Sequence, residues 1–239
     1  MEKFGFHVIF LIPLAILCLL FALTFWLARH ASEMAAAVNG QPAQTPPPDP
    51  HRPSPEKTKV FLRMAWLSNP CAYIAINTLI AVIPGLAARF ELSPMFAGFA
   101  CSLWCFARFG AFLALWLWPG WHYRFRWLAT AFAMLAIAFV VILTVPSLAV
   151  LLIAQIFFGA AIGLLYYSSL FYSMDAGDTK GEHGGIHEAA IGFGNFVGPG
   201  LGAASLQFPP QHPHSGALAV GVLLFCGFAG LLTIWKTAR

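Results

Sequence analysis

The chain has 239 residues, of which 59% are hydrophobic and only 9% are charged, and its net charge is +4 at neutral pH. A soluble globular domain usually contains about 25% charged residues, so this composition excludes an ordinary soluble protein and indicates a polytopic membrane protein. The positive charges are few and scattered, which argues against nucleic acid as a partner. The first partner that the sequence predicts is therefore the lipid bilayer.

Seven apolar segments are long enough to cross a bilayer as helices. They are residues 7–28, 60–86, 95–118, 127–145, 147–172, 187–206 and 216–235. The first segment follows Lys3, as a signal peptide would, but its apolar core is too long and no small-residue cleavage site closes it. We therefore expect an all-α membrane protein with about seven transmembrane helices.

A long linker, residues 29–57, follows the first apolar segment. It contains a proline-rich run that begins at Pro46, and such runs are extended and solvated rather than folded. The linker divides the chain into a first transmembrane helix (residues 1–28), the linker itself and a bundle of six helices (residues 58–239). The later connections are short.

Lysine and arginine are distributed unequally between alternate connections. One side of the predicted bundle collects Arg29, Arg52, Lys57, Lys59, Arg124, Arg126, Lys180, Lys236 and Arg239. The other side has only Lys3 and Arg89. Because cytoplasmic loops are enriched in lysine and arginine, we expect the linker and the C-terminus in the cytoplasm and the N-terminus outside, in the cell (inner) membrane.

The segment of residues 186–206 is apolar yet rich in glycine. Gly194, Gly198 and Gly202 are four residues apart, so they share one face of a helix, and Pro199 lies among them. Each glycine costs a helix about 1 kcal/mol in water relative to alanine, but in a bilayer the helix must form because unpaired backbone groups find no water. Small residues let a neighbouring helix approach closely. The pattern predicts a packing helix, and the alternative is a helix that slides or bends during a transport cycle.

Polar side chains interrupt two of the apolar segments. Asn69, Tyr73 and Asn77 are spaced by four residues, so they share one helix face. Arg108 lies near the middle of the third segment, where an unpaired charge costs at least about 2.5–3.5 kcal/mol. Such side chains either line a substrate cavity, with Arg108 as the counter-charge of an anion, or are satisfied by neighbouring helices and backbone carbonyls. Both interpretations stay open.

A second semi-polar face lies on the fifth segment and contains Gln155, Gly159, Gly163 and Tyr166. Tyr166 and its neighbour Tyr167 are suited to contact an amphipathic ligand, but we favour a role as anchors at the membrane interface. The residues that we expect to face a substrate cavity are Asn69, Tyr73, Asn77, Arg108 and Gln155. The residues that we expect to pack or gate helices are Gly159, Gly163, Gly194, Gly198, Pro199 and Gly202.

The order of the segments resembles the second half of the major facilitator superfamily. The stretch FLRMAWLSNPCAYIAINTLIAVIPGLAARFELSP (residues 61–94) is similar to a seventh helix, with a polar stripe and a Pro-Gly exit. QIFFGAAIGLLYYSSLFYSMD (residues 155–175) is similar to a tenth helix, with Gly159 and Gly163 at GxxxG spacing. EAAIGFGNFVGPGLG (residues 188–202) is similar to an eleventh helix. The loop PGWHYRFRW departs from the family because it contains arginines but no aspartate.

The resemblance implies a six-helix half bundle preceded by one helix, corresponding to helices six to twelve of the family. It also implies transport of a small-molecule substrate without chemical change and without a cofactor. Alternating access rocks one half of such a transporter against the other around a midplane site. We therefore expect a partner, either a second six-helix half or another copy of this chain.

The main alternative is a truncated relative that keeps the fold and has a structural or regulatory role without transport. A seven-helix receptor fits the predicted topology, but the last apolar segment has no central lysine for retinal, and no extracellular cysteine pair is present. An enzyme is not expected, because no Ser/His pair, paired aspartates or metal set falls at membrane depth.

The sequence GEHGGIHEAA suggests a metal site at first sight. His183 and His187 are four residues apart and Glu188 follows, so in a helix the two imidazoles would share a face. Gly184 and Gly185 lie between them and favour a loop. We therefore expect no metal, and a helix that begins here with Glu188 in its first turn, where a carboxylate complements the helix dipole.

Overall fold

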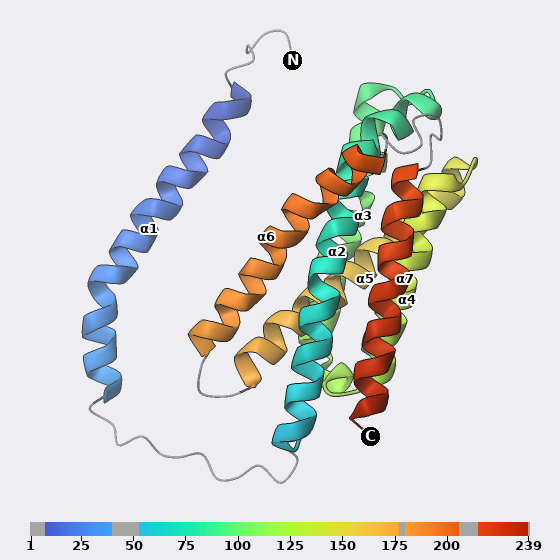
Figure 1. Ribbon diagram of the computed structural model, residues 1–239. Coiled ribbons are helices and arrows are strands. Elements are labelled where there is room, and N and C mark those ends of the chain that lie inside the picture. Colours follow the sequence, from blue (N-terminus) through green and yellow to red (C-terminus); the bar gives the residue numbers. More distant parts are fainter. Residues whose placement is uncertain (1–7, 40–52, 177–179, 206–214, 239) are drawn as a thin grey trace. The chain divides into compact units, whose positions relative to one another are not determined.

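A computed structural model describes residues 8–39, 53–176, 180–205 and 215–238 (Figure 1). Its elements are α1 (Val8–Asn39), α2 (Pro55–Arg89), α3 (Pro94–Leu117), the 3-10 turn η1 (Pro119–Trp121), α4 (Phe125–Thr144), α5 (Leu148–Asp175), α6 (Lys180–Ser205) and α7 (Ser215–Thr237). Every element within those ranges is helical, so the expected all-α fold is confirmed.

Five helices, α2, α3, α4, α5 and α7, are long and apolar enough to cross a membrane. The glycine-rich α6 and the described side chains of α1, with an apolar run at Leu14–Trp26, fall short of that standard. About 20 apolar residues are needed to span the hydrocarbon core. The protein is thus an integral membrane protein, with five clear spans among its described residues where seven segments had been expected.

The chain forms two compact units, Met1–Arg52 and Pro53–Arg239. The described part of the first unit is α1, which continues to Asn39 instead of ending at position 28. The residues that extend it include a run of three alanines, the best helix former. The proline-rich run that begins at Pro46 lies outside the described residues.

Within the second unit, α2 is the central helix, because it packs against α3, α4, α5, α6 and α7. Figure 1 shows α6, α2 and α7 side by side, with α3, α5 and α4 in a layer behind them. The Ser54 side chain caps α2 by accepting a hydrogen bond from the Lys57 backbone N–H at 3.3 Å. Two prolines, Pro70 and Pro84, lie inside this helix.

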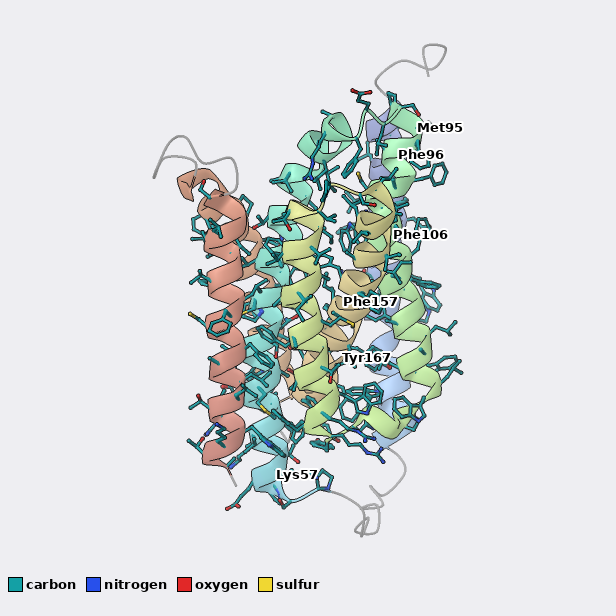
Figure 2. The ribbon with its side chains drawn as sticks, turned by 90° about the vertical axis from the view of Figure 1, so that its right-hand side faces the viewer. Lys57, Met95, Phe96, Phe106, Phe157 and Tyr167 are labelled. Atoms are coloured by element: carbon teal, nitrogen blue, oxygen red, sulfur yellow. The ribbon has the colours of Figure 1, made fainter. Side chains whose placement is uncertain are left out.

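The core lies between the two layers, and the outer faces are strongly apolar. Phe61 of α2, Phe132 of α4 and Phe158 of α5 are completely buried. On α3, by contrast, large apolar side chains such as Met95 and Phe106 project away from the bundle (Figure 2) and are 77% and 62% exposed. An outer surface of this kind is suited to lipid acyl chains rather than water.

The connection between α3 and α4 folds back onto the end of α5. The Trp121 side chain is buried, and its Nε1 donates to the Leu115 carbonyl at 3.2 Å. The Tyr123 backbone N–H donates to the Tyr172 hydroxyl at 3.1 Å, and the Tyr123 hydroxyl donates to the Asp175 carboxylate. Asp175 therefore supplies a carboxylate to a loop that has none of its own.

Burial is the main cause that raises the pKa of the Tyr123 hydroxyl, and the hydrogen bond to Asp175 raises it further. The hydroxyl therefore stays protonated and remains a donor at neutral pH. We expect Tyr123→Phe to lower the free energy of unfolding by about 1.5–3 kcal/mol, the usual contribution of a hydrogen bond to a charged group. The measurement is reversible unfolding in detergent micelles.

Tyr167→Phe is the matched control, because the Tyr167 ring packs against Trp121 and its hydroxyl makes no hydrogen bond with any described residue. Equal effects of the two substitutions would show that the bond to Asp175 contributes nothing to stability.

Glycines set the spacing between α3 and α5. A methyl group built on Gly159 would lie 2.1 Å from the Trp104 carbonyl oxygen, and one on Gly163 would lie 2.7 Å from Cβ of Ala111. Neither distance is sterically allowed. The two helices therefore approach more closely than any other residue at these positions permits.

We expect Gly159→Ala to destabilise the bundle by about 1–3 kcal/mol, because the methyl group must push two backbones apart. The control is Gly110→Ala on α3, where a methyl group would meet nothing within 4 Å and where alanine should be neutral or stabilising by up to about 1 kcal/mol. Detergent unfolding curves measure both. The packing argument fails if the two variants unfold alike.

Candidate functional site

Arg108 lies on α3, partly buried, and is surrounded by aromatic rings. Its Nη2 donates to the Tyr73 hydroxyl at 3.2 Å. The guanidinium carbon lies 4.8 Å from the ring centre of Tyr166, 5.3 Å from that of Phe112 and 5.8 Å from that of Tyr73. Cations within about 6 Å of an aromatic face are attracted to it. Among the described residues no carboxylate lies within ion-pair distance of Arg108, so aromatic faces and a phenol stabilise its charge.

His187 of α6 is completely buried beside this group. Its ring centre lies 5.1 Å from that of Tyr166. Its Nδ1 lies 2.9 Å from the Ser169 hydroxyl and 3.5 Å from Nδ2 of Asn69. An amide nitrogen can only donate, so in this arrangement Nδ1 accepts and the proton of the neutral ring sits on Nε2. Both Nε2 of His187 and Oδ1 of Asn69 are buried without a hydrogen-bond partner among the described residues.

Polar contacts continue along α2 and α6 in both directions. On one side, Nδ2 of Asn77 donates to Oδ1 of Asn195 at 2.8 Å. On the other side, Nε1 of Trp66 donates to the Ser173 hydroxyl at 3.0 Å, and the Trp66 ring packs against His183 with 5.4 Å between centres. These contacts form one row, which we call the polar seam. Its members are Trp66, Asn69, Tyr73, Asn77, Arg108, Tyr166, Ser169, Ser173, His183, His187 and Asn195.

The central part of the polar seam is reachable from outside the bundle. Tyr73, Asn77, Arg108 and Tyr166 are partly exposed, and Asn195 is exposed. Polar and charged groups are costly to expose to hydrocarbon, so in membrane proteins they face other protein or a water-filled cavity. This side of the bundle therefore differs from the apolar outer face of α3.

Four of the five residues expected to face a cavity belong to the polar seam: Asn69, Tyr73, Asn77 and Arg108. Gln155 does not. Its side chain is buried, and its Nε2 donates to the Ala100 carbonyl at 2.7 Å, which ties α5 to α3. Gln155 precedes Tyr166 on α5 by about 16 Å along the helix axis.

Two of the glycines expected to pack helices bring α6 onto α2 beside the polar seam. A methyl group on Gly194 would lie 2.4 Å from Cβ of Tyr73, and one on Gly198 would lie 2.9 Å from the Ile74 carbonyl oxygen. Pro199 is exposed inside α6, and the surroundings of Gly202 lie outside the described side chains. A gating role for these residues remains a prediction.

The expected loop at Gly184 and Gly185 was wrong, and so was the expected position of Glu188. The helix α6 begins at Lys180 and has Glu182 in its first turn, so both glycines and Glu188 lie inside it. In a bilayer, unpaired backbone groups find no water, so the helix forms despite a glycine penalty of about 1 kcal/mol per residue, and His183 then packs on Trp66 and His187 on Tyr166.

The two histidines consequently share a face, as their spacing of four residues allows, and both join the polar seam. That spacing was the sequence signal for His187, which had been considered only as a metal ligand. Within the described residues no three His, Cys, Asp or Glu side chains are grouped closely enough to hold a metal ion.

The expected role of Tyr166 as an interfacial anchor stays a prediction. Tyr166 lies between Arg108 and His187 and contacts both. Tyr167 packs against Phe112 with 6.1 Å between ring centres.

The fold and this site define an integral membrane helical bundle with a partly buried arginine that forms no ion pair among the described residues. No protein-family model, curated protein or solved structure matches the chain. What the protein does must therefore be inferred from its own residues.

If the polar seam faces water, Asn195 should be accessible to a water-soluble reagent. In a cysteine-free background, we expect Asn195→Cys to react several times faster with a charged, membrane-impermeant thiol reagent than Phe109→Cys does. Both positions are exposed, but Phe109 lies on the outer face of α3, and the charged reagent attacks thiolates in water rather than thiols in lipid. The measurement is the labelling rate in lipid vesicles. Equal rates would mean that this side of the bundle meets no water.

Proposed function

We propose that the protein is one half of a membrane transporter that moves a small solute by alternating access with a partner half. The observation that carries the proposal is Arg108, which is partly exposed, lies among aromatic rings and forms no ion pair among the described residues. It belongs to a bundle whose outer surface is otherwise largely apolar. A binding site for a polar solute in a membrane needs such convergent polar groups within apolar helices.

The polar seam also supports the need for a partner. Arg108, Asn77 and Asn195 would be in contact with lipid if nothing covered them, at a cost of several kcal/mol for the charge alone. A second membrane protein surface that leaves a water-filled space over the seam removes this cost. In the major facilitator superfamily, which the sequence resembles, a second six-helix half provides such a surface.

We further propose that this assembly lies in the cell (inner) membrane, with the C-terminus in the cytoplasm. Support comes from the unequal distribution of lysine and arginine in the sequence. Lys57 marks the end of the bundle that we assign to the cytoplasm, and Met95 and Phe96 lie at the opposite end (Figure 2).

A second candidate is a structural or regulatory membrane protein that transports nothing. The glycine contacts at Gly159 and Gly194 favour it, because they lock α3 to α5 and α2 to α6 at distances that leave no room for a methyl group. In this case the polar seam would serve helix packing alone.

The first experiment is the mass of the complex purified in detergent from membranes of a host that carries the native neighbouring genes, corrected for bound detergent. A stoichiometric second membrane chain, or a second copy of this chain, supports the half-transporter. A stable monomer without a partner would contradict it and favour the structural candidate.

The second experiment reconstitutes that complex in liposomes and measures uptake from a panel of radiolabelled sugars, amines and carboxylates. For a solute that accumulates, we expect Arg108→Ala to reduce uptake about 10- to 100-fold, because a hydrogen bond to a charged group contributes about 1.5–3 kcal/mol. The control is Phe109→Ala on the outer face of α3, which should leave uptake unchanged. An unchanged rate in Arg108→Ala would remove Arg108 from the solute site.

A further inference from the structure

We propose that the polar seam binds a planar monocarboxylate at Arg108 and takes up a proton at His187 as it does so. This inference rests on the proposed function, because it names the substrate class and the coupling ion of the same site.

The Arg108 guanidinium has the geometry to bind a carboxylate. It is a planar group with five N–H donors, and among the described residues it forms one hydrogen bond, from Nη2 to the Tyr73 hydroxyl. The remaining donors match the two oxygens of a carboxylate in a bidentate pair. A single guanidinium balances a single negative charge, which favours a monocarboxylate over a phosphate or a dicarboxylate.

The aromatic rings around Arg108 favour a ligand whose carboxylate is attached to a flat apolar group. Tyr73, Phe112 and Tyr166 each present a ring within 6 Å of the guanidinium carbon. A flat, apolar group attached to the carboxylate can stack on these faces, with ring centres about 4.5–7 Å apart. An aromatic carboxylate such as benzoate therefore fits the chemistry of the site better than a charged or strongly hydrated solute.

Nδ1 of His187 faces groups that can form a hydrogen bond with it in either protonation state of the ring. In the neutral ring, Nδ1 accepts a hydrogen bond from the Asn69 amide or the Ser169 hydroxyl. In the protonated ring, Nδ1–H can donate to the Ser169 oxygen, or to Oδ1 of Asn69 after a flip of the amide, and that oxygen is buried without a partner in this structure. Histidine is the side chain whose ordinary pKa lies closest to neutral pH.

The charged and titratable groups around His187 come from four helices. They are Tyr73 of α2, Arg108 of α3, Tyr166 of α5, and His183 and Glu188 of α6 itself. Glu188 is exposed and makes no ion pair with Arg108. Among the described residues of α7, which also packs against α6, none makes a hydrogen bond or ring contact with His187.

A single side chain, Tyr166, lies between the carboxylate site at Arg108 and the proton site at His187. The centre of its ring lies 4.8 Å from the Arg108 guanidinium carbon and 5.1 Å from the centre of the His187 ring. In the empty site, a protonated His187 is repelled by Arg108; a bound carboxylate cancels the Arg108 charge and removes this repulsion. Proton and carboxylate therefore favour each other's binding, and this linkage is reciprocal. Together they cross the membrane as a neutral pair.

The probe is benzoate, with benzamide as its neutral counterpart of the same shape, titrated into the purified full-length protein and followed by calorimetry. We expect benzoate to bind at least about fivefold more tightly near pH 5.5 than near pH 7.5, because the buried His187 takes up its proton as the pH falls, as for a modest coupling between sites. Benzoate stays ionised over this range. Binding near pH 7 should be accompanied by proton uptake, measured in weakly buffered solution.

Three variants separate the two roles. Arg108→Gln should weaken benzoate binding about tenfold or more. His187→Gln, which keeps a polar side chain beside Ser169, should still bind benzoate but lose the pH dependence and the proton uptake. Phe109→Ala, on the outer face, should behave as the unchanged protein.

Equal binding of benzoate and benzamide, or full binding by Arg108→Gln, would overturn the carboxylate site. A pH-independent affinity, or pH dependence that survives in His187→Gln, would overturn the proton site. The proposed function fails in a different way: benzoate then binds with the expected pH dependence but does not cross liposomes that contain the complex. Transport of another solute without benzoate binding would overturn this inference and leave the proposed function in place.

Discussion

The polar seam depends on the close approach of two helix pairs, α2 with α6 and α3 with α5. Gly194 brings the α6 backbone onto Tyr73, and Gly159 brings the α5 backbone onto the carbonyl of Trp104. At this spacing, short side chains such as Asn77 and Asn195 reach each other directly, at 2.8 Å. Wider spacing would break this hydrogen bond between the two helices, and a typical hydrogen bond contributes about 0.5–1.5 kcal/mol. The glycine contacts thus determine the polar chemistry that the bundle can support.

The position of Arg108 is consistent with the energetics of charge in a membrane. Among the described residues, no acid forms an ion pair with it, and aromatic faces and one phenol surround it. Such an environment reduces the cost of burying the cation without neutralising it. The side chain therefore keeps a net attraction for an anion, which an ion pair within the chain would have removed.

Much of this arrangement was predictable from the sequence, because it follows from helical periodicity. The all-α fold and the shared face of Asn69, Tyr73 and Asn77 required only the spacing of residues along single helices. The contacts of His187, Tyr166 and Gln155 depend on which helix lies opposite, and that is a tertiary property that spacing along single helices does not predict. The start of α6 was missed because the local preference of Gly184 and Gly185 indicated a loop there. The resemblance to the major facilitator superfamily remains a prediction.

Pro70, inside the central helix, has a mechanical consequence. Proline has no N–H, so the Trp66 carbonyl receives no hydrogen bond from position 70. A bend of α2 at this level, as at Pro84, breaks one backbone bond fewer than a bend at a residue with an N–H. Pro70 lies between Asn69 and Tyr73, two members of the polar seam. The central helix is therefore easiest to bend at the level where its side chains meet α3 and α6.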